Sequence, residues 1–143
     1  MGGLTNEDGV SMSDVPSEAE IVERAIRAVG ELDVDEVLRW VADDLVLELP
    51  FRAGGFPTTL VGADAHAFLR LVGRLFDRMD FFEIVVHGMT PSGVIVAEYK
   101  SNGLTRTGKP YRNQYAAFFE VRSGKVSRWR EYFDPDVVAA AMG

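Results

Sequence analysis

Residues 111–133 read YRNQYAAFFEVRSGKVSRWREYF, and this stretch decides the fold. Its two halves, Tyr111 to Val121 and Val126 to Phe133, alternate between apolar and polar residues, which is typical of β-strands. Between them lies Ser123-Gly124-Lys125, a short run of turn-forming residues. The stretch therefore predicts an antiparallel hairpin at the end of the chain.

Further strands are predicted on the N-terminal side of this hairpin. Phe81 to His87 and Val94 to Ser101 are strand-like segments, and Thr90-Pro91-Ser92-Gly93 between them is a tight turn. An earlier strand, Leu45-Val46-Leu47-Glu48-Leu49, ends at a proline. We expect the later strands to form a meander, with the early strand paired at its edge.

Helices are predicted before the meander. Ser17 and Glu20 form a capping box for a helix that ends at Gly30. Asp33 caps a second, short helix. A third begins at Gly62, and its apolar stripe runs through Phe68, Leu69, Val72, Phe76 and Met79. Helices followed by a meander indicate the α+β class, with helices packed on one face of a curved antiparallel sheet.

The domain organisation follows from composition. Residues 1–16 are rich in Gly, Ser, Asn and Asp, and we interpret them as a flexible N-terminal tail. Residues 17–143 then form a single domain, which is large enough to fold around one core.

Composition also excludes several classes of function. The chain has 143 residues, no cysteine and a formal net charge of −7, so thiol chemistry and nucleic acid are not expected. No apolar run approaches the roughly 20 residues that cross a membrane, and we expect a cytoplasmic protein with no membrane partner. His66 and His87 are widely spaced, and we predict neither a metal nor a cofactor.

Glu131 is the principal catalytic candidate. Strand alternation places Glu131 on the same face as Trp129 and Phe133. A carboxyl between two aromatic side chains on an apolar face should have a raised pKa, which suits a group that exchanges protons near neutrality. The alternative is a glutamate that pairs with a neighbouring Arg or Lys, or that faces water.

A second carboxylate, Glu98, is also a catalytic candidate. Glu98 and Lys100 share one face of their predicted strand. If they met Glu131 in one pocket, one carboxyl could stay ionised while the other stayed protonated. The alternative is an exposed cross-strand ion pair.

Other side chains are expected to form the walls of a pocket. Tyr111, Asn113 and Tyr115 share a strand face with Phe119 and Val121, and Asn113 can both donate and accept toward a carbonyl or hydroxyl group. The predicted substrate-binding set comprises Tyr111, Asn113, Tyr115, Trp40, Phe51, Phe56, Phe68 and Trp129. Tyr111 could instead lie in a dimer interface, and Asn113 could be a turn or strand-pairing residue. The plain-core alternative applies to Trp40, Phe51, Phe56 and Phe68.

The C-terminal motifs resemble those of the SnoaL-like proteins. The similar segments are Thr107 to Tyr115, Phe119-Glu120-Val121, Gly124-Lys125-Val126 and Trp129 to Pro135. The pattern Tyr-Arg-Asn followed by Arg-Glu-Tyr-Phe-Asp-Pro is most similar to the phenazine-biosynthesis A/B proteins, and the last run is also similar to limonene epoxide hydrolase. The resemblance extends from about Ile21 to Pro135. It places the chain in the superfamily of nuclear transport factor two and ketosteroid isomerase, and it implies a cone-shaped, cystatin-like α+β barrel, often dimeric, with a pocket between helices and sheet.

The catalytic residues of these relatives are matched only in part. The acidic residue of the phenazine proteins falls on Glu131, but their pocket histidine falls near Leu69. The base and the tyrosine acid of ketosteroid isomerase fall near Leu49 and Ala25. The charged set of the epoxide hydrolase would be met by Lys100, Glu98 and Glu131, with charge types exchanged at two positions.

Three hypotheses about function follow. The first is a cofactor-free isomerase, cyclase or dehydratase that acts on a small, apolar, carbonyl-bearing metabolite, with Glu131 as the proton carrier. The second is a non-catalytic protein that binds a small apolar molecule. The third is an epoxide-opening hydrolase or cyclase. In each case the expected partners are a small organic ligand and a second copy of the chain.

Overall fold

The computed structural model describes residues 15–51 and 57–143. Their elements, in chain order, are α1 (Glu18–Gly30), α2 (Val34–Trp40), β1 (Val41–Glu48), β2 (Thr59–Val61), α3 (Ala63–Leu75), β3 (Phe76–Met89), β4 (Ile95–Thr105), β5 (Pro110–Arg122), β6 (Lys125–Tyr132) and α4 (Pro135–Met142). The flexible tail predicted for residues 1–16 lies almost wholly outside the described residues. None of the helices in the described ranges has the length and apolar character needed to cross a membrane.

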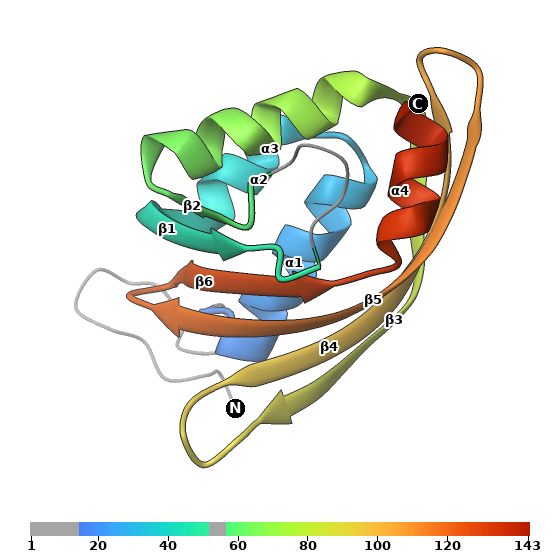
Figure 1. The fold of residues 1–143 in the computed structure, drawn as a ribbon. Coiled ribbons are helices and arrows are strands. Elements are labelled where there is room, and N and C mark those ends of the chain that lie inside the picture. The colour runs from blue at the N-terminus through green and yellow to red at the C-terminus, as the bar shows by residue number, and fades with distance from the viewer. Residues whose placement is uncertain (1–14, 52–56) are drawn as a thin grey trace.

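The strands form one curved sheet in the order β2-β1-β6-β5-β4-β3 (Figure 1). β3, β4, β5 and β6 form the predicted antiparallel meander. β1 pairs in parallel with β6 and antiparallel with β2, so the early strand does join the edge of the meander. The predicted α+β class is confirmed. The sheet is an open cone, because its two edge strands, β2 and β3, are not hydrogen-bonded to each other.

The β5–β6 hairpin is built as residues 111–133 predict. Arg122 pairs with Lys125, which leaves Ser123 and Gly124 as a two-residue loop. Both loop residues have positive φ, 53° and 78°, as a type I′ turn requires. This turn matches the right-handed twist of the strands and so sets the register of the hairpin.

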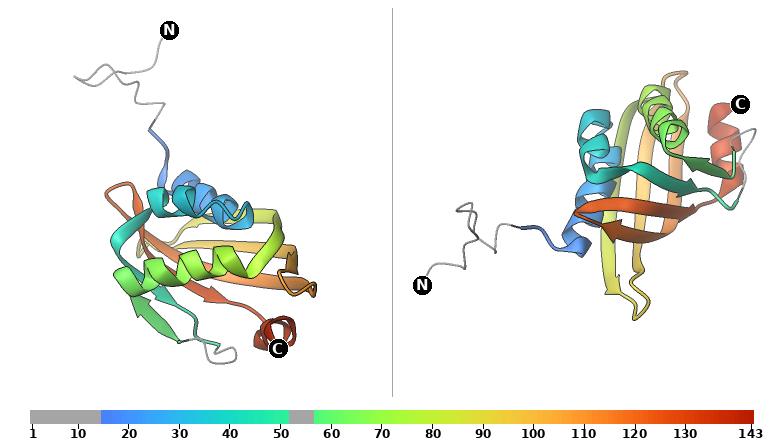
Figure 2. Two further views of the ribbon diagram at one scale, coloured as in Figure 1. Left: turned by 90° about the horizontal axis from the view of Figure 1, so that it is seen from above. Right: turned by 90° about the vertical axis from the view of Figure 1, so that its left-hand side faces the viewer.

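The N-terminal helices cover the concave face of the sheet (Figure 2). The Ser17 side chain accepts from the Glu20 backbone N–H at 3.2 Å, and Asp33 caps α2 in the same way, so both predicted caps are confirmed. α1 contacts β3, β4, β5 and β6. Its buried side chains, among them Ile21, Val22 and Ile26, meet the inward residues of the sheet in one core.

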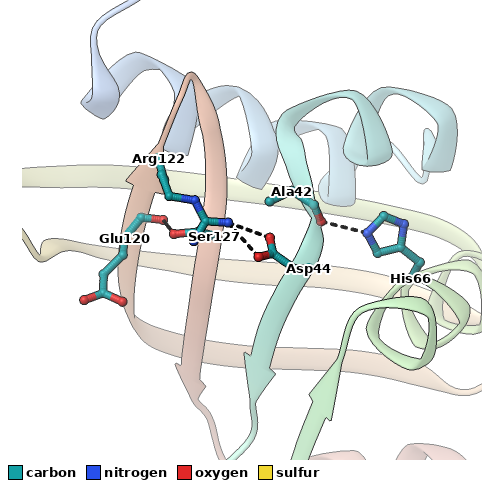
Figure 3. A network of polar contacts seen from close by, with 6 residues as sticks. All are labelled: Ala42, Asp44, His66, Glu120, Arg122 and Ser127. Carbon is teal, nitrogen blue, oxygen red and sulfur yellow. Dashed lines mark hydrogen bonds and ion pairs between the residues drawn. The ribbon is translucent and has the colours of Figure 1, made fainter.

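Polar contacts join α3 and the end of β5 to β1 (Figure 3). Arg122, at the end of β5, pairs with Asp44 of β1 at 2.6 Å. His66 of α3 lies with its Nε2 atom 2.9 Å from the carbonyl oxygen of Ala42, also in β1. These contacts hold α3 and the β5–β6 hairpin against the same strand.

One predicted boundary was wrong, and one helix was missed. The helix predicted to continue to Met79 ends at Leu75, and Phe76 already begins β3. The helix α4 was not predicted at all, although Asp134 caps it, Pro135 begins it and an apolar run follows. Because Val138 and Met142 of α4 line the cavity described below, this helix bears directly on the site.

Candidate active site in the mouth of the cone

A small cavity lies between the sheet, the helices α1 and α3, and the C-terminal helix α4. Its volume is about 100 Å³. Apolar side chains form most of its wall, including those of Val29, Phe68, Phe76, Met79, Phe133 and Val138. Tyr111, Tyr115 and Glu131 carry the polar groups among the described residues that line it. An apolar cavity with a few convergent polar groups has the character of a ligand site.

A larger hollow of about 400 Å³ lies elsewhere on the molecule. Residues of β4, β5 and the start of α4 line it, among them Lys100, Arg112 and Gln114. Several residues that line it, among them Phe82, Arg112 and Gln114, are exposed, whereas mostly apolar side chains surround Glu131 in the smaller cavity. The smaller cavity is therefore the better candidate for chemistry.

Glu131 lies on the face of β6 that the sequence predicts. Part of the residue remains accessible, but its carboxyl is surrounded by protein groups, and the Tyr99 hydroxyl donates a hydrogen bond to Oε2. Burial raises the pKa of Glu131 to about 7, and the contacts with Tyr99 and Trp129 oppose this rise. At neutral pH the carboxyl is thus close to half protonated and can both take and give a proton.

Three tyrosines surround Glu131. Tyr99 and Tyr115 stack with ring centroids 4.9 Å apart and an interplanar angle of 16°. Burial raises the pKa of Tyr111 to about 12, and burial also raises the pKa of Tyr99 and of Tyr115 well above the usual value. All three phenols therefore stay protonated near neutrality and act as hydrogen-bond donors.

Tyr99 and Ser101 were missed by the sequence analysis. Both are buried in β4, where they lie on the same face as Ala97 and opposite to Glu98. The signal was available, because alternation along this strand separates Ala97, Tyr99 and Ser101 from the charged residues Glu98 and Lys100. The prediction considered the face of Glu98 and Lys100, whereas the face of Tyr99 and Ser101 is the buried one.

The structure places the catalytic candidate Glu98 outside the cavity and agrees with the alternative, an exposed cross-strand pair. Its side chain is 64% exposed and its Oε2 lies 2.7 Å from the Nε2 of His87. Lys100 pairs with Glu83 at 2.7 Å, also at the surface. Because Tyr99 faces inward, strand alternation forces both neighbours outward. The structure does not bring Glu98, Lys100 and Glu131 together.

Asn113 is buried, but it does not line the cavity. Its side-chain amide donates to the Tyr111 hydroxyl at 3.1 Å and to the Asp134 carbonyl at 3.0 Å. Its Oδ1 accepts from the backbone N–H groups of Gln114 and Asp134. The protein uses every donor and acceptor position of the amide, so none is left for the substrate contact that the sequence analysis predicts.

The other predicted wall residues divide between the cavity and the rest of the molecule. Phe68 lines the cavity with Tyr111 and Tyr115. Trp129 is buried against Phe119 and is not among the residues that line the cavity, although its indole lies near enough to Glu131 to lower the pKa of that carboxyl. Trp40 donates to Glu36 at 2.8 Å, and Phe51 is 52% exposed. Phe56 lies outside the described residues.

The raised pKa of Glu131 predicts that the stability of the protein depends on pH. The folded pKa of about 7 lies above the ordinary value of 4.5, so the folded state binds the proton more tightly than the unfolded state. The contribution of Glu131 to the free energy of unfolding is therefore fully present below about pH 4.5. It is lost as the pH rises to about 7 and above. At 1.36 kcal/mol per pKa unit the loss is on the order of 3 kcal/mol.

Replacing Glu131 with Gln should remove this dependence. We expect Glu131→Gln to be more stable than the wild type in urea unfolding at about pH 8 and close to it at about pH 4.5. Equal destabilisation of the variant at both pH values would show that burying the ionised carboxyl does not lower the stability of the wild-type protein.

The described residues thus build an α+β cone that encloses a small apolar cavity with one protonatable carboxyl. The model of the SnoaL-like domain matches residues 22–129. The chain therefore belongs to the SnoaL-like domain family.

One similar protein is named as an epoxide hydrolase, and two similar structures are of proposed enzymes. The chain is 31% identical over 115 residues to the epoxide hydrolase EphG of Mycobacterium tuberculosis, which covers 79% of this chain and 70% of that protein. A proposed isomerase from Bacillus subtilis has a similar structure, with a TM-score of 0.78, 26% identity and coverage of 87% of this chain and 91% of that one. A proposed polyketide cyclase from Xanthomonas campestris has a TM-score of 0.69 and 25% identity, and the match covers 86% and 94% of the two chains.

Proposed function

We propose that this protein is a cofactor-free acid-base enzyme of the isomerase, cyclase or dehydratase type that acts on a small, apolar, carbonyl-bearing metabolite. The observation that carries the proposal is the Glu131 carboxyl, whose pKa is about 7 in an apolar cavity that it shares with phenolic donors. The likeness to a proposed isomerase and a proposed polyketide cyclase supports the same class.

The chemistry follows from these groups. The carboxylate form of Glu131 removes a proton from the carbon next to the carbonyl group, and the electron pair of that C–H bond moves toward the carbonyl oxygen. A phenolic O–H from the tyrosine cluster donates a hydrogen bond to the developing enolate oxygen. Protonated Glu131 then returns the proton to a different carbon in an isomerisation, or to a leaving hydroxyl in a dehydration.

A second candidate function is epoxide opening, which the 31% identity to EphG favours. Protonated Glu131 would donate to the epoxide oxygen while a nucleophile attacks carbon. Among the described residues lining the cavity, Glu131 is the sole carboxyl, so a carboxylate base for the nucleophile is missing there. The acid-base enzyme on a carbonyl compound therefore fits the site better.

Hydrogen exchange next to a ketone tests the proposal without knowledge of the natural substrate. In D2O, the protein should accelerate exchange of the α-hydrogens of cyclohexanone, which proton NMR follows directly. The rate should rise with pH through about 7, as Glu131 loses its proton, and then level off. If cyclohexanone, cyclohexenone and acetophenone bind but none exchanges faster than in buffer, the non-catalytic binding protein replaces the enzyme.

A further inference from the structure

A chain of hydroxyl groups runs beside the cavity. The Ser101 hydroxyl lies 2.9 Å from that of Tyr115, and the Tyr115 hydroxyl lies 2.8 Å from that of Tyr111. Asn113 donates a hydrogen bond to each of the two terminal hydroxyl groups of this row. Its backbone N–H donates to Ser101 Oγ at 3.2 Å, and its side-chain amide donates to Tyr111 Oη at 3.1 Å.

The direction of the Asn113 amide is set by Asp134, the N-cap residue of α4. The amide nitrogen faces the carbonyl oxygen of Asp134, and the amide oxygen faces the backbone N–H of the same residue. A flipped amide would place two acceptors against each other and two donors against each other. Tyr111 Oη therefore always receives a hydrogen bond from Asn113 and cannot donate to it.

Counting protons shows that one donor is left over. Ser101, Tyr115 and Tyr111 carry three hydroxyl protons, but the two contacts between them use only two. Both ends of the chain accept from Asn113, so neither end can pass the third proton to it. One O–H of the three thus points outside the chain.

The spare donor belongs on a tyrosine. Ser101 is 2% exposed although it borders the larger hollow, and its Oγ makes its hydrogen bonds to Tyr115 and to the Asn113 N–H, so a spare proton there would be poorly paired at a cost. Tyr111 and Tyr115 line the cavity, where a ligand can accept the hydrogen bond. The Tyr99 hydroxyl is not available in its place, because it donates to Glu131.

We propose that Asn113 is a positioning residue that directs one phenolic O–H of the Tyr111–Tyr115 pair into the cavity, where it binds the oxygen of a neutral ketone or aldehyde. This inference rests on the proposed function and names its ligand class. The described lining residues include no cation, so the site selects a neutral oxygen and rejects a carboxylate. The rest of the ligand is apolar, as the wall is.

The first test uses conservative tyrosine variants and two probes of the same shape. Cyclohexanone has the oxygen, whereas methylenecyclohexane lacks it. At about pH 8.5 Glu131 is ionised and cannot donate, so the infrared carbonyl stretch of bound cyclohexanone reports the tyrosine donor alone. Tyr111→Phe and Tyr115→Phe should each keep the lowered stretch, because either change still leaves one spare proton on the remaining tyrosine.

The double variant Tyr111→Phe/Tyr115→Phe should lose the donor. Its carbonyl stretch should return toward the value in hydrocarbon solvent, and its affinity for cyclohexanone should fall about five-fold, the size of one hydrogen bond. Its affinity for methylenecyclohexane should stay within about two-fold. A lowered stretch that survives in the double variant, or that disappears in a single variant, would overturn the proposal.

The second test changes the positioning residue. Asn113→Asp turns the donor toward Tyr111 into an acceptor, so Tyr111 donates to it and the spare proton leaves the cavity. The lowered carbonyl stretch should disappear. Adding Tyr111→Phe to this variant should restore it, because Tyr115 then keeps the spare proton. A purely structural role for Asn113 predicts that the double variant is worse, and that result would overturn the proposal.

Binding and turnover separate this inference from the proposed function. Wild-type protein that exchanges cyclohexanone hydrogens without a lowered carbonyl stretch contradicts the inference alone. Protein that lowers the stretch as described but accelerates no exchange contradicts the enzyme and leaves the carbonyl site in place. If Asn113→Asp does not fold, the tyrosine variants, which leave the Asn113–Asp134 contacts intact, still decide the outcome.

Discussion

Glu131→Gln is expected to reduce exchange of the α-hydrogens of cyclohexanone by about 10²- to 10⁴-fold, the usual contribution of a positioned acid-base group. Glutamine keeps the shape of the side chain and an oxygen that accepts from Tyr99, but it cannot carry a proton. Affinity for cyclohexanone should change little, because the proposed donor to its oxygen is a tyrosine. NMR exchange rates and binding titrations measure the two effects separately.

Glu98→Gln is the matched control for this experiment. It is the same substitution in the same sheet, but Glu98 is 64% exposed and points away from the cavity. We expect exchange within about two-fold of the wild type. Equal losses in both variants would mean that the effect comes from the charge of the sheet and not from the cavity.

Phe76→Ala is expected to have the largest effect on stability among single changes in the cavity wall. Phe76 is 6% exposed and its ring centroid lies 5.2 Å from that of Tyr111. Removing a buried phenylalanine loses its transfer free energy and leaves a void, which costs about 3 to 5 kcal/mol. Urea unfolding monitored by circular dichroism measures this loss.

Phe82→Ala controls for the loss of an aromatic residue from β3. Phe82 lies on the same strand and is 38% exposed, so its removal should cost less than about 1 kcal/mol. If both variants lost the same free energy, Phe76 would not be part of the core that separates the cavity from solvent.

Much of the fold could be predicted because local patterns carry it. The cap at Ser17 and the Ser123–Gly124 turn each depend on residues a few positions apart. The end of α3 could not be predicted in this way, because the apolar stripe continues through Phe76 and Met79 while the backbone has already become a strand. Pairing of Phe76 with Thr105 of β4 decides that boundary, and it joins residues far apart in the sequence.

The candidate site could be predicted only in part for a related reason. Alternation along β6 was enough to turn Glu131 inward, because Trp129 and Phe133 on the same face are strongly apolar. In β4 the same rule offered two faces, and the charged one drew the prediction to Glu98. Which face looks inward depends on the neighbouring strand, where Tyr115 pairs with Tyr99.

By itself, the sequence determined the α+β class, the meander and the inward direction of Glu131, since these follow from periodicity and from turn and cap residues within single segments. Only the tertiary structure decided what surrounds that carboxyl. Tyr99 reaches Glu131 from β4, Val138 and Met142 reach the cavity from α4, and Asn113 is held by Asp134. Burial, a pKa and the direction of a hydrogen bond depend on groups brought together from distant parts of the chain. A local sequence pattern does not predict such long-range contacts.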